Sequence, residues 1–170
     1  LEPMNCTALV KDGRCDIWAG HQAPTLVKWL GGKRAGIESD AVTVHIPFLG
    51  GGFGRRAELD FVQEAVFIAA QVPGVPVKTV WSREEDMRHD RYRPAMAATM
   101  MAALAPKGGI EAFGASIAGP SLSRQFAGRL SPSFAADSPD KTNVEGATWL
   151  PYSLPALRVR HAQVPTPLPC

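Results

Sequence analysis

The chain has 170 residues, of which 45% are apolar and 20% charged, and its formal net charge is +2. This composition predicts a globular protein with enough apolar material for a core, and the nearly neutral charge gives no support for nucleic-acid binding. The three cysteines lack the spacing of a metal site or a disulfide framework, and no apolar run reaches the ~20 residues of a membrane span. Because the chain starts at "LEPMN" and stops inside a Pro-rich passage, we expect it to be a piece of a longer polypeptide.

The first 90 residues contain five predicted elements. Apolar runs on both sides of Asp12-Gly13 predict a β-hairpin, and a proline followed by paired glycines predicts a helix over about 23–30. Alternating valines predict a strand within 40–48, residues 57–71 a mostly buried helix with one thin polar stripe, and 75–81 another strand. The order strand, glycine loop, helix, strand is typical of a βαβ-like unit.

The second half is predicted from its turn residues. Residues 94–119 favour a long hairpin, 121–143 a long loop with one short helix near 124–129, and 144–170 an edge strand with a Pro-rich extension. Together the segments predict an α+β fold with a mixed sheet and packed helices. The βαβ-containing lobe would cover residues 1–120 and include the glycine loop at 50–54.

The stretch "FLGGGFGRR" at 48–56 is the strongest candidate for a functional site. Consecutive glycines lose more conformational freedom on ordering than other residues, so they need a physical reason. The glycine spacing matches neither a dinucleotide fingerprint nor a phosphate P-loop, because position 55 is arginine in both alignments. Backbone amides with Arg55 and Arg56 would suit an anion or an oxo ligand. A tight strand-to-helix turn without a ligand is the alternative.

The chain resembles the molybdenum hydroxylases, the xanthine dehydrogenase and aldehyde oxidase family. "GGGFG" follows a predicted strand and precedes a buried helix as it does in that family, and "LEPMNCTA", "DIWAGHQAP", "PVKTVWSREEDM" and "GATWLPYSLPALRVRHAQVPT" resemble further family segments in the same order. The resemblance covers nearly the whole chain apart from the region around 121–143. "GGGFGRR" together with "PLPC" is most similar to the beta subunit of the isoquinoline oxidoreductase branch.

The resemblance implies a domain that binds a molybdenum–pterin cofactor, expected in the cytosine dinucleotide form. Gly51, Gly52 and Phe53, with Gly54 and Arg55, match the loop against the cofactor, so bare main chain there would let the cofactor approach closely. Gln22 matches the glutamine whose amide donates to a molybdenum oxo group. No residue would bind the metal directly, since the pterin holds it. The glutamate that acts as general base is expected downstream of Cys170, so no catalytic residue is assigned here.

The activity that the resemblance implies is hydroxylation of an aldehyde or an N-heteroaromatic carbon with oxygen from water. Electrons would pass to iron–sulfur clusters on a partner subunit, with a cytochrome left open as the final acceptor, in the bacterial periplasm or cytoplasm. Where the xanthine branch has a purine-contacting glutamate, this chain has Arg55, Arg56 and Ala57, which disfavours purines. We expect the isolated piece to be inactive. A non-catalytic module that binds anions or nucleotides, or a structural domain, is the alternative.

Overall fold

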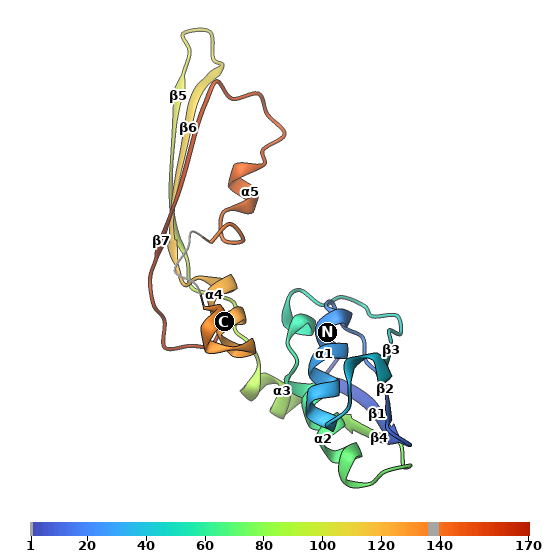
Figure 1. The fold of residues 1–170 in the computed structure, drawn as a ribbon. Helices are drawn as coiled ribbons and strands as arrows, with labels where there is room; N and C mark the ends of the chain where they lie inside the picture. Colours follow the sequence, from blue (N-terminus) through green and yellow to red (C-terminus); the bar gives the residue numbers. More distant parts are fainter. Residues whose placement is uncertain (1, 136–139) are drawn as a thin grey trace. The chain divides into compact units, whose positions relative to one another are not determined.

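The computed structural model describes residues 2–135 and 140–170, and its chain divides into two compact units, Leu1–Asp90 and Arg91–Cys170 (Figure 1). Both units combine strands with helices, so the protein has the predicted α+β fold with mixed sheets and packed helices. The division differs from the lobe expected over 1–120. The strands of the 94–119 hairpin belong to the second unit because one of them is hydrogen-bonded to a strand near the C-terminus.

The first unit is built on a four-stranded sheet with the order β3-β2-β1-β4. β1 (Asn5–Lys11) and β2 (Arg14–Trp18) form the predicted antiparallel hairpin. Its turn residues Asp12 and Gly13 have φ values of 49° and 73°, which is the conformation that an Asp-Gly hairpin turn requires. β3 (Val42–His45) pairs parallel with β2, and β4 (Val77–Val80) pairs antiparallel with β1. The sheet is therefore mixed.

The predicted βαβ order is present, but its two strands are not neighbours. β3 leads through the glycine loop and the short 3-10 helix η2 (Arg55–Ala57) into α2 (Asp60–Gln71), which returns the chain to β4. β3 and β4 run in the same direction, since β1 is antiparallel to β2 and to β4 while β3 is parallel to β2. The β1–β2 hairpin separates them, so they lie at opposite edges of the sheet.

Helix α1 (Pro24–Ala35) continues past the paired glycines that were predicted to end it. It ends at Gly36, whose φ of 69° is the left-handed C-cap conformation, and the Ile37 N–H bonds to the carbonyl of Gly32. Gly31 and Gly32 are buried, and a Cβ on Gly32 would lie 2.7 Å from the Ile37 carbonyl oxygen. These glycines therefore let other segments pack closely against the helix rather than stopping it.

The core of the first unit lies between the sheet and the two helices, with α2 packed on β1 and β4 and α1 packed on α2 and β3. Its apolar members from the strands and α2 are Cys6, Ala8, Cys15, Ile17, Val42, Phe61, Val62, Ala65, Val66 and Ala69. Burial raises the pKa of the Cys6 thiol to about 12 and that of Cys15 to about 11, so both stay protonated. The exposed face of α2 is wider than the predicted polar stripe, because the apolar residues Phe67 and Ile68 are also exposed.

The second unit contains the predicted long hairpin. β5 (Ala97–Leu104) and β6 (Ile110–Gly119) pair antiparallel, and β7 (Ala156–Gln163) pairs parallel with β6 to give the order β5-β6-β7. The connection from β6 to β7 contains α4 (Leu122–Leu130), the 3-10 helix η3 (Pro132–Phe134) and α5 (Glu145–Thr148). The helix predicted near 124–129 is thus α4, whereas residues 136–139 of the predicted loop lie outside the described residues.

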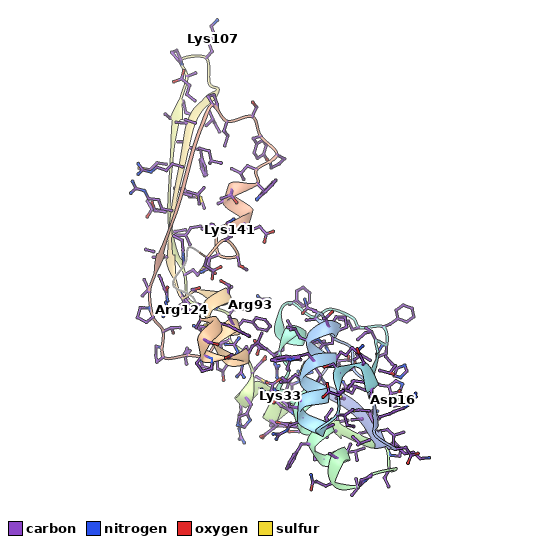
Figure 2. All side chains as sticks on the ribbon, in the orientation of Figure 1. Asp16, Lys33, Arg93, Lys107, Arg124 and Lys141 are labelled. Carbon is purple, nitrogen blue, oxygen red and sulfur yellow. The ribbon has the colours of Figure 1, made fainter. Side chains whose placement is uncertain are left out.

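The sheet of the second unit has few buried positions. Every residue of β5 is exposed, and Figure 2 shows side chains projecting from both faces of the sheet, with Lys107 at the β5–β6 turn. Its exposed large apolar residues are Met100, Met101, Leu104, Ile110 and Leu157. This sheet therefore contributes little core of its own, in contrast to the sheet of the first unit.

Candidate functional site at the glycine loop

The glycine loop between β3 and α2 has an unusual backbone. Gly51 and Gly54 have φ values of 131° and 88°, and Phe53 has a φ of 46°, which is costly for a residue with a large side chain. A Cβ added to Gly51 would lie 2.7 Å from the ring of Phe53, so the glycine leaves room for that ring. Phe53 and Phe48 are exposed. The loop thus presents two aromatic side chains and strained main chain to its surroundings.

Gln22, which precedes α1, lies directly against this loop. Its side-chain oxygen Oε1 accepts a hydrogen bond of 2.9 Å from the N–H of Gly54, and its own N–H donates to the carbonyl of Arg56 over 2.8 Å. A Cβ on Gly52 would lie 2.5 Å from Gln22 Cδ and 2.8 Å from Cγ. The structure therefore brings Gln22 together with Gly52 and Gly54, residues that are some thirty positions apart along the chain.

The side chain of Arg55 is directed into the protein. Nη1 donates to Asp60 Oδ1 over 2.9 Å, and Nε lies 2.6 Å from Asp90 Oδ1 in an ion pair without hydrogen-bond alignment. The guanidinium also lies over the rings of Trp81 and Phe61, at 5.3 and 5.9 Å from their centroids. Its positive charge is thus engaged by two carboxylates and two aromatic rings. The side chain of Arg55 is therefore engaged mainly by groups of the protein.

Arg56, which the sequence suggested as a partner for an anion together with Arg55, has a structural role in the site. Its side chain is fully buried, Nη1 donates to the carbonyl of Gly20 over 2.8 Å, and Nη2 donates to Glu2 Oε1 over 2.6 Å. It therefore fastens both the N-terminal segment and the segment before Gln22 to the glycine loop. With both arginines occupied by groups of the protein, the loop lacks the cationic side chains on which the anion-binding alternative depended.

The N-terminus of α2 is also satisfied by the protein itself. Asp60, its first residue, accepts a hydrogen bond of 2.9 Å from the N–H of Phe61 through Oδ1, the same oxygen that pairs with Arg55. A carboxylate at this position already complements the positive end of the helix dipole. The Asp60 carboxylate therefore makes this helix end less favourable for an anion.

His21 is buried immediately beside Gln22 and serves the packing of the site. The Ala23 N–H donates to its Nδ1 over 2.9 Å, so Nδ1 is the acceptor and Nε2 carries the proton that is donated to the Glu58 carbonyl over 3.0 Å. Burial is the main cause that lowers the pKa of this imidazole below 6.5, and the positive charge of Arg56 acts in the same direction. The neutral ring links the segment before α1 to the entrance of α2.

We expect the free energy of unfolding to fall as the pH drops below about 6.5, the ordinary pKa of histidine. In that range the unfolded chain takes up a proton that buried His21 does not, so the unfolded state is favoured progressively until the lowered native pKa is reached. Above pH 6.5 His21 is neutral in both the folded and the unfolded state, so its contribution to the free energy of unfolding is fully present. Thermal unfolding from pH 5 to 8 should show a shallower slope in His21→Gln, which retains a donor and an acceptor. Equal slopes in the two proteins would contradict this role for His21.

No group of three or more histidine, cysteine, aspartate or glutamate residues in the described segments is arranged to hold a metal ion. In the same segments, no helix combines the length and the apolar character that crossing a bilayer requires. The polar groups that the loop offers to a ligand are therefore neutral amides. The Nε2 group of Gln22 has no partner among the described residues, and it is a donor.

The chain belongs to the molybdopterin cofactor-binding domain family, whose model matches residues 1–166. It is 38% identical over 96 residues to isoquinoline 1-oxidoreductase subunit beta of Brevundimonas diminuta, which covers 56% of this chain and 12% of that protein. It is 36% identical over 103 residues to the membrane-bound aldehyde dehydrogenase (pyrroloquinoline-quinone) of Gluconacetobacter polyoxogenes, and the match covers 60% of this chain and 13% of that protein. The chain therefore spans about an eighth of the length of these relatives.

Solved structures agree with this family at the level of the fold. Aldehyde oxidoreductase from Desulfovibrio gigas superimposes with a TM-score of 0.68 over 95% of this chain and 17% of its own length, at 18% identity. CO dehydrogenase from Oligotropha carboxidovorans superimposes with a TM-score of 0.55 over 69% of this chain and 15% of its own length, at 26% identity. The predicted resemblance to the molybdenum hydroxylases is thus confirmed for the domain.

Proposed function

We propose that this chain is part of the large subunit of a molybdenum hydroxylase and forms one wall of its cofactor site. The observation that carries the proposal is the hydrogen bond from the Gly54 N–H to Gln22 Oε1, within a segment that matches the cofactor-binding family. That bond leaves the Nε2 group of Gln22 as a donor at the surface of the loop. An uncharged donor suits a redox-active centre, because it binds an oxygen ligand without adding charge to it.

The residues present fit the cofactor through neutral donors and bare main chain. Gln22 would donate from Nε2 to a ligand of the metal, while the backbone of Gly51, Gly52, Phe53, Gly54 and Arg55 would lie against the cofactor. When bound, the molybdenum–pterin group supplies the oxidation chemistry, and the protein supplies position and electrostatics. The exposed ring of Phe53 would cover part of the site and exclude water. The general base would come from sequence beyond Cys170.

We further propose an aldehyde or an N-heteroaromatic compound as the substrate, with oxygen taken from water. The relatives named above act, by their names, on isoquinoline and on an aldehyde, which supports these two classes. We also propose that the cofactor is in the cytosine dinucleotide form and that a partner subunit carries iron–sulfur clusters. A cytochrome is a candidate electron acceptor. Glu58, the carboxylate closest in sequence to the purine-contacting position, is buried, which argues against a purine.

The proposal is tested by metal and pterin analysis of the full-length protein with Gln22 varied. We expect stoichiometric molybdenum and pterin in the wild type. Gln22→Leu, which cannot donate, should lower kcat by about 10–100-fold while the protein stays folded, as is common when a group next to a metal's ligands is removed. Activity would be measured with an aldehyde and with an N-heteroaromatic substrate.

Gln71→Leu is the matched control, since Gln71 is an exposed residue at the end of α2. Its activity and its molybdenum content should equal those of the wild type. A full-length protein that purifies without molybdenum or pterin, and that binds a nucleotide or phosphate instead, would contradict the proposal and support the non-catalytic alternative.

A further inference from the structure

The orientation of the Gln22 amide follows from the group that it faces. The N–H of Gly54 can only donate, so the atom 2.9 Å away must be the carbonyl oxygen of the glutamine side chain. The NH2 group is then on the opposite side of Cδ, where the described residues offer it no partner. The protein therefore uses the acceptor of this amide itself and leaves the donor for something else.

The main chain of Gln22 is fixed as firmly as its side chain. Its N–H donates to the Arg56 carbonyl over 2.8 Å, and the neighbouring His21 is buried with both ring nitrogens hydrogen-bonded. The buried Arg56 side chain binds the carbonyl of Gly20, two residues earlier. A backbone and a side-chain hydrogen bond thus hold Gln22 at both ends of the 54–56 turn, and a displaced side chain would lose its bond to Gly54.

Gly52 is the residue that makes room for this side chain. A Cβ at position 52 would approach Gln22 Cδ to 2.5 Å and Cγ to 2.8 Å, distances that Cβ atoms in proteins do not adopt. A Cβ at Gly50, by contrast, would meet nothing within 4 Å, and Gly50 does not have a positive φ. A side chain at position 52 would therefore displace the Gln22 side chain from the position described, whether or not a ligand approaches the loop.

We propose that Gly52 is a positioning residue, and that with the Gly54 N–H it holds Gln22 with its NH2 group toward the bound cofactor. This inference rests on the proposed function for the identity of the ligand, and on the contacts above for the positioning. It changes the reason for the glycine run. Position 52 is bare because a Cβ there would meet Gln22, and this leaves its backbone free to lie against a cofactor.

A double-mutant cycle on the full-length protein separates the two reasons. Gly52→Ala and Gln22→Ala should each lower the molybdenum retained after gel filtration by about 10-fold. Gly52→Ala in the Gln22→Ala background should cause no further loss, because the side chain it collides with is gone. Multiplicative losses in the double variant would show that the glycine serves a different contact, and would overturn the inference.

The molybdenum that is retained gives a readout that a purely structural role would leave unchanged. The electron paramagnetic resonance signal of molybdenum(V) should shift in Gly52→Ala and in Gln22→Glu, whose carboxylate can accept from Gly54 but cannot donate. Gly109→Ala in the β5–β6 turn is the control, since its Cβ would meet nothing within 4 Å and its φ is not positive, and it should keep the wild-type signal. An unshifted signal in Gly52→Ala would contradict the positioning role.

The failure of the proposed function gives a different result. If the protein contains no molybdenum, the proposed ligand is wrong. Thermal unfolding of the wild type, Gly52→Ala, Gln22→Ala and the double variant still tests the contact between Gly52 and Gln22. A drop in the melting temperature for Gly52→Ala that disappears in the Gln22→Ala background would keep the positioning of Gln22 by Gly52 while excluding the cofactor as its target. Additive drops would reject the positioning as well.

Discussion

Replacing Arg56 with methionine is expected to lower the free energy of unfolding of the first unit by about 3 kcal/mol, the largest effect that we expect from a single change. The change removes two charge-assisted hydrogen bonds, to Gly20 and to Glu2, and leaves the Gly20 carbonyl without its buried donor. Hydrogen exchange of the amides in β1 to β4, measured in the full-length protein, reports the stability of this unit directly.

Glu2→Gln is the matched control for Arg56. Glutamine keeps an acceptor oxygen for Nη2 of Arg56, and the side chain of Glu2 is 55% exposed, so we expect a loss of about 1 kcal/mol. If Arg56→Met and Glu2→Gln were equally mild, the buried guanidinium would not be what fastens the N-terminal segment to the loop.

Gly32→Ala is expected to lower the free energy of unfolding by about 2 kcal/mol. Alanine normally favours a helix interior over glycine by ~1 kcal/mol. Here the new Cβ would lie 2.7 Å from the Ile37 carbonyl oxygen and 3.4 Å from Ser39 Cα. Because both atoms are main chain, they cannot turn aside as a side chain would, and overpacking costs about 1–3 kcal/mol or somewhat more. The same hydrogen-exchange measurement on α1 and β3 checks this.

Gly128 in α4 provides the control of opposite sign. A Cβ there would meet only Ala135 Cβ at 3.5 Å, an ordinary contact. Gly128→Ala should therefore stabilise its helix by about 0.5–1 kcal/mol. A destabilised Gly128→Ala, or a stabilised Gly32→Ala, would show that the local backbone differs from the one described.

Turns with a specific backbone requirement could be predicted from the sequence, whereas packing could not. Asp12-Gly13 correctly predicted a hairpin, since both residues adopt the positive φ that this turn needs. The glycines at 31 and 32 were wrongly taken as a helix end, because the sequence cannot distinguish a glycine that stops a helix from one that packs against another segment. The sequence also could not predict that two strands separate β3 from β4, since the order of strands in the chain does not give their order in the sheet.

For the candidate site, the sequence indicated which residues to consider but not the direction of every side chain. The resemblance assigned Gln22 and the glycine loop to one cofactor, and the structure brings Gln22 into contact with Gly52 and Gly54. Their role in binding a cofactor stays a prediction. The direction of the Arg55 side chain could not be predicted, because carboxylates at positions 60 and 90 draw it inward only once the chain is folded. Arg56 was interpreted as part of an anion site rather than as a structural residue, since a charged side chain after a loop is usually solvated.

The exposed sheet of the second unit has a consequence for how the protein is made. The first unit buries both helices against its own strands, so it has what it needs to become stable early in synthesis. In the second unit, Met100, Met101 and Leu157 stay in water, and the outer edges of β5 and β7 have no strand beside them among the described residues. Such edges pair readily with other chains. While these edges are uncovered, this stretch is where a nascent molecule would aggregate or recruit a chaperone.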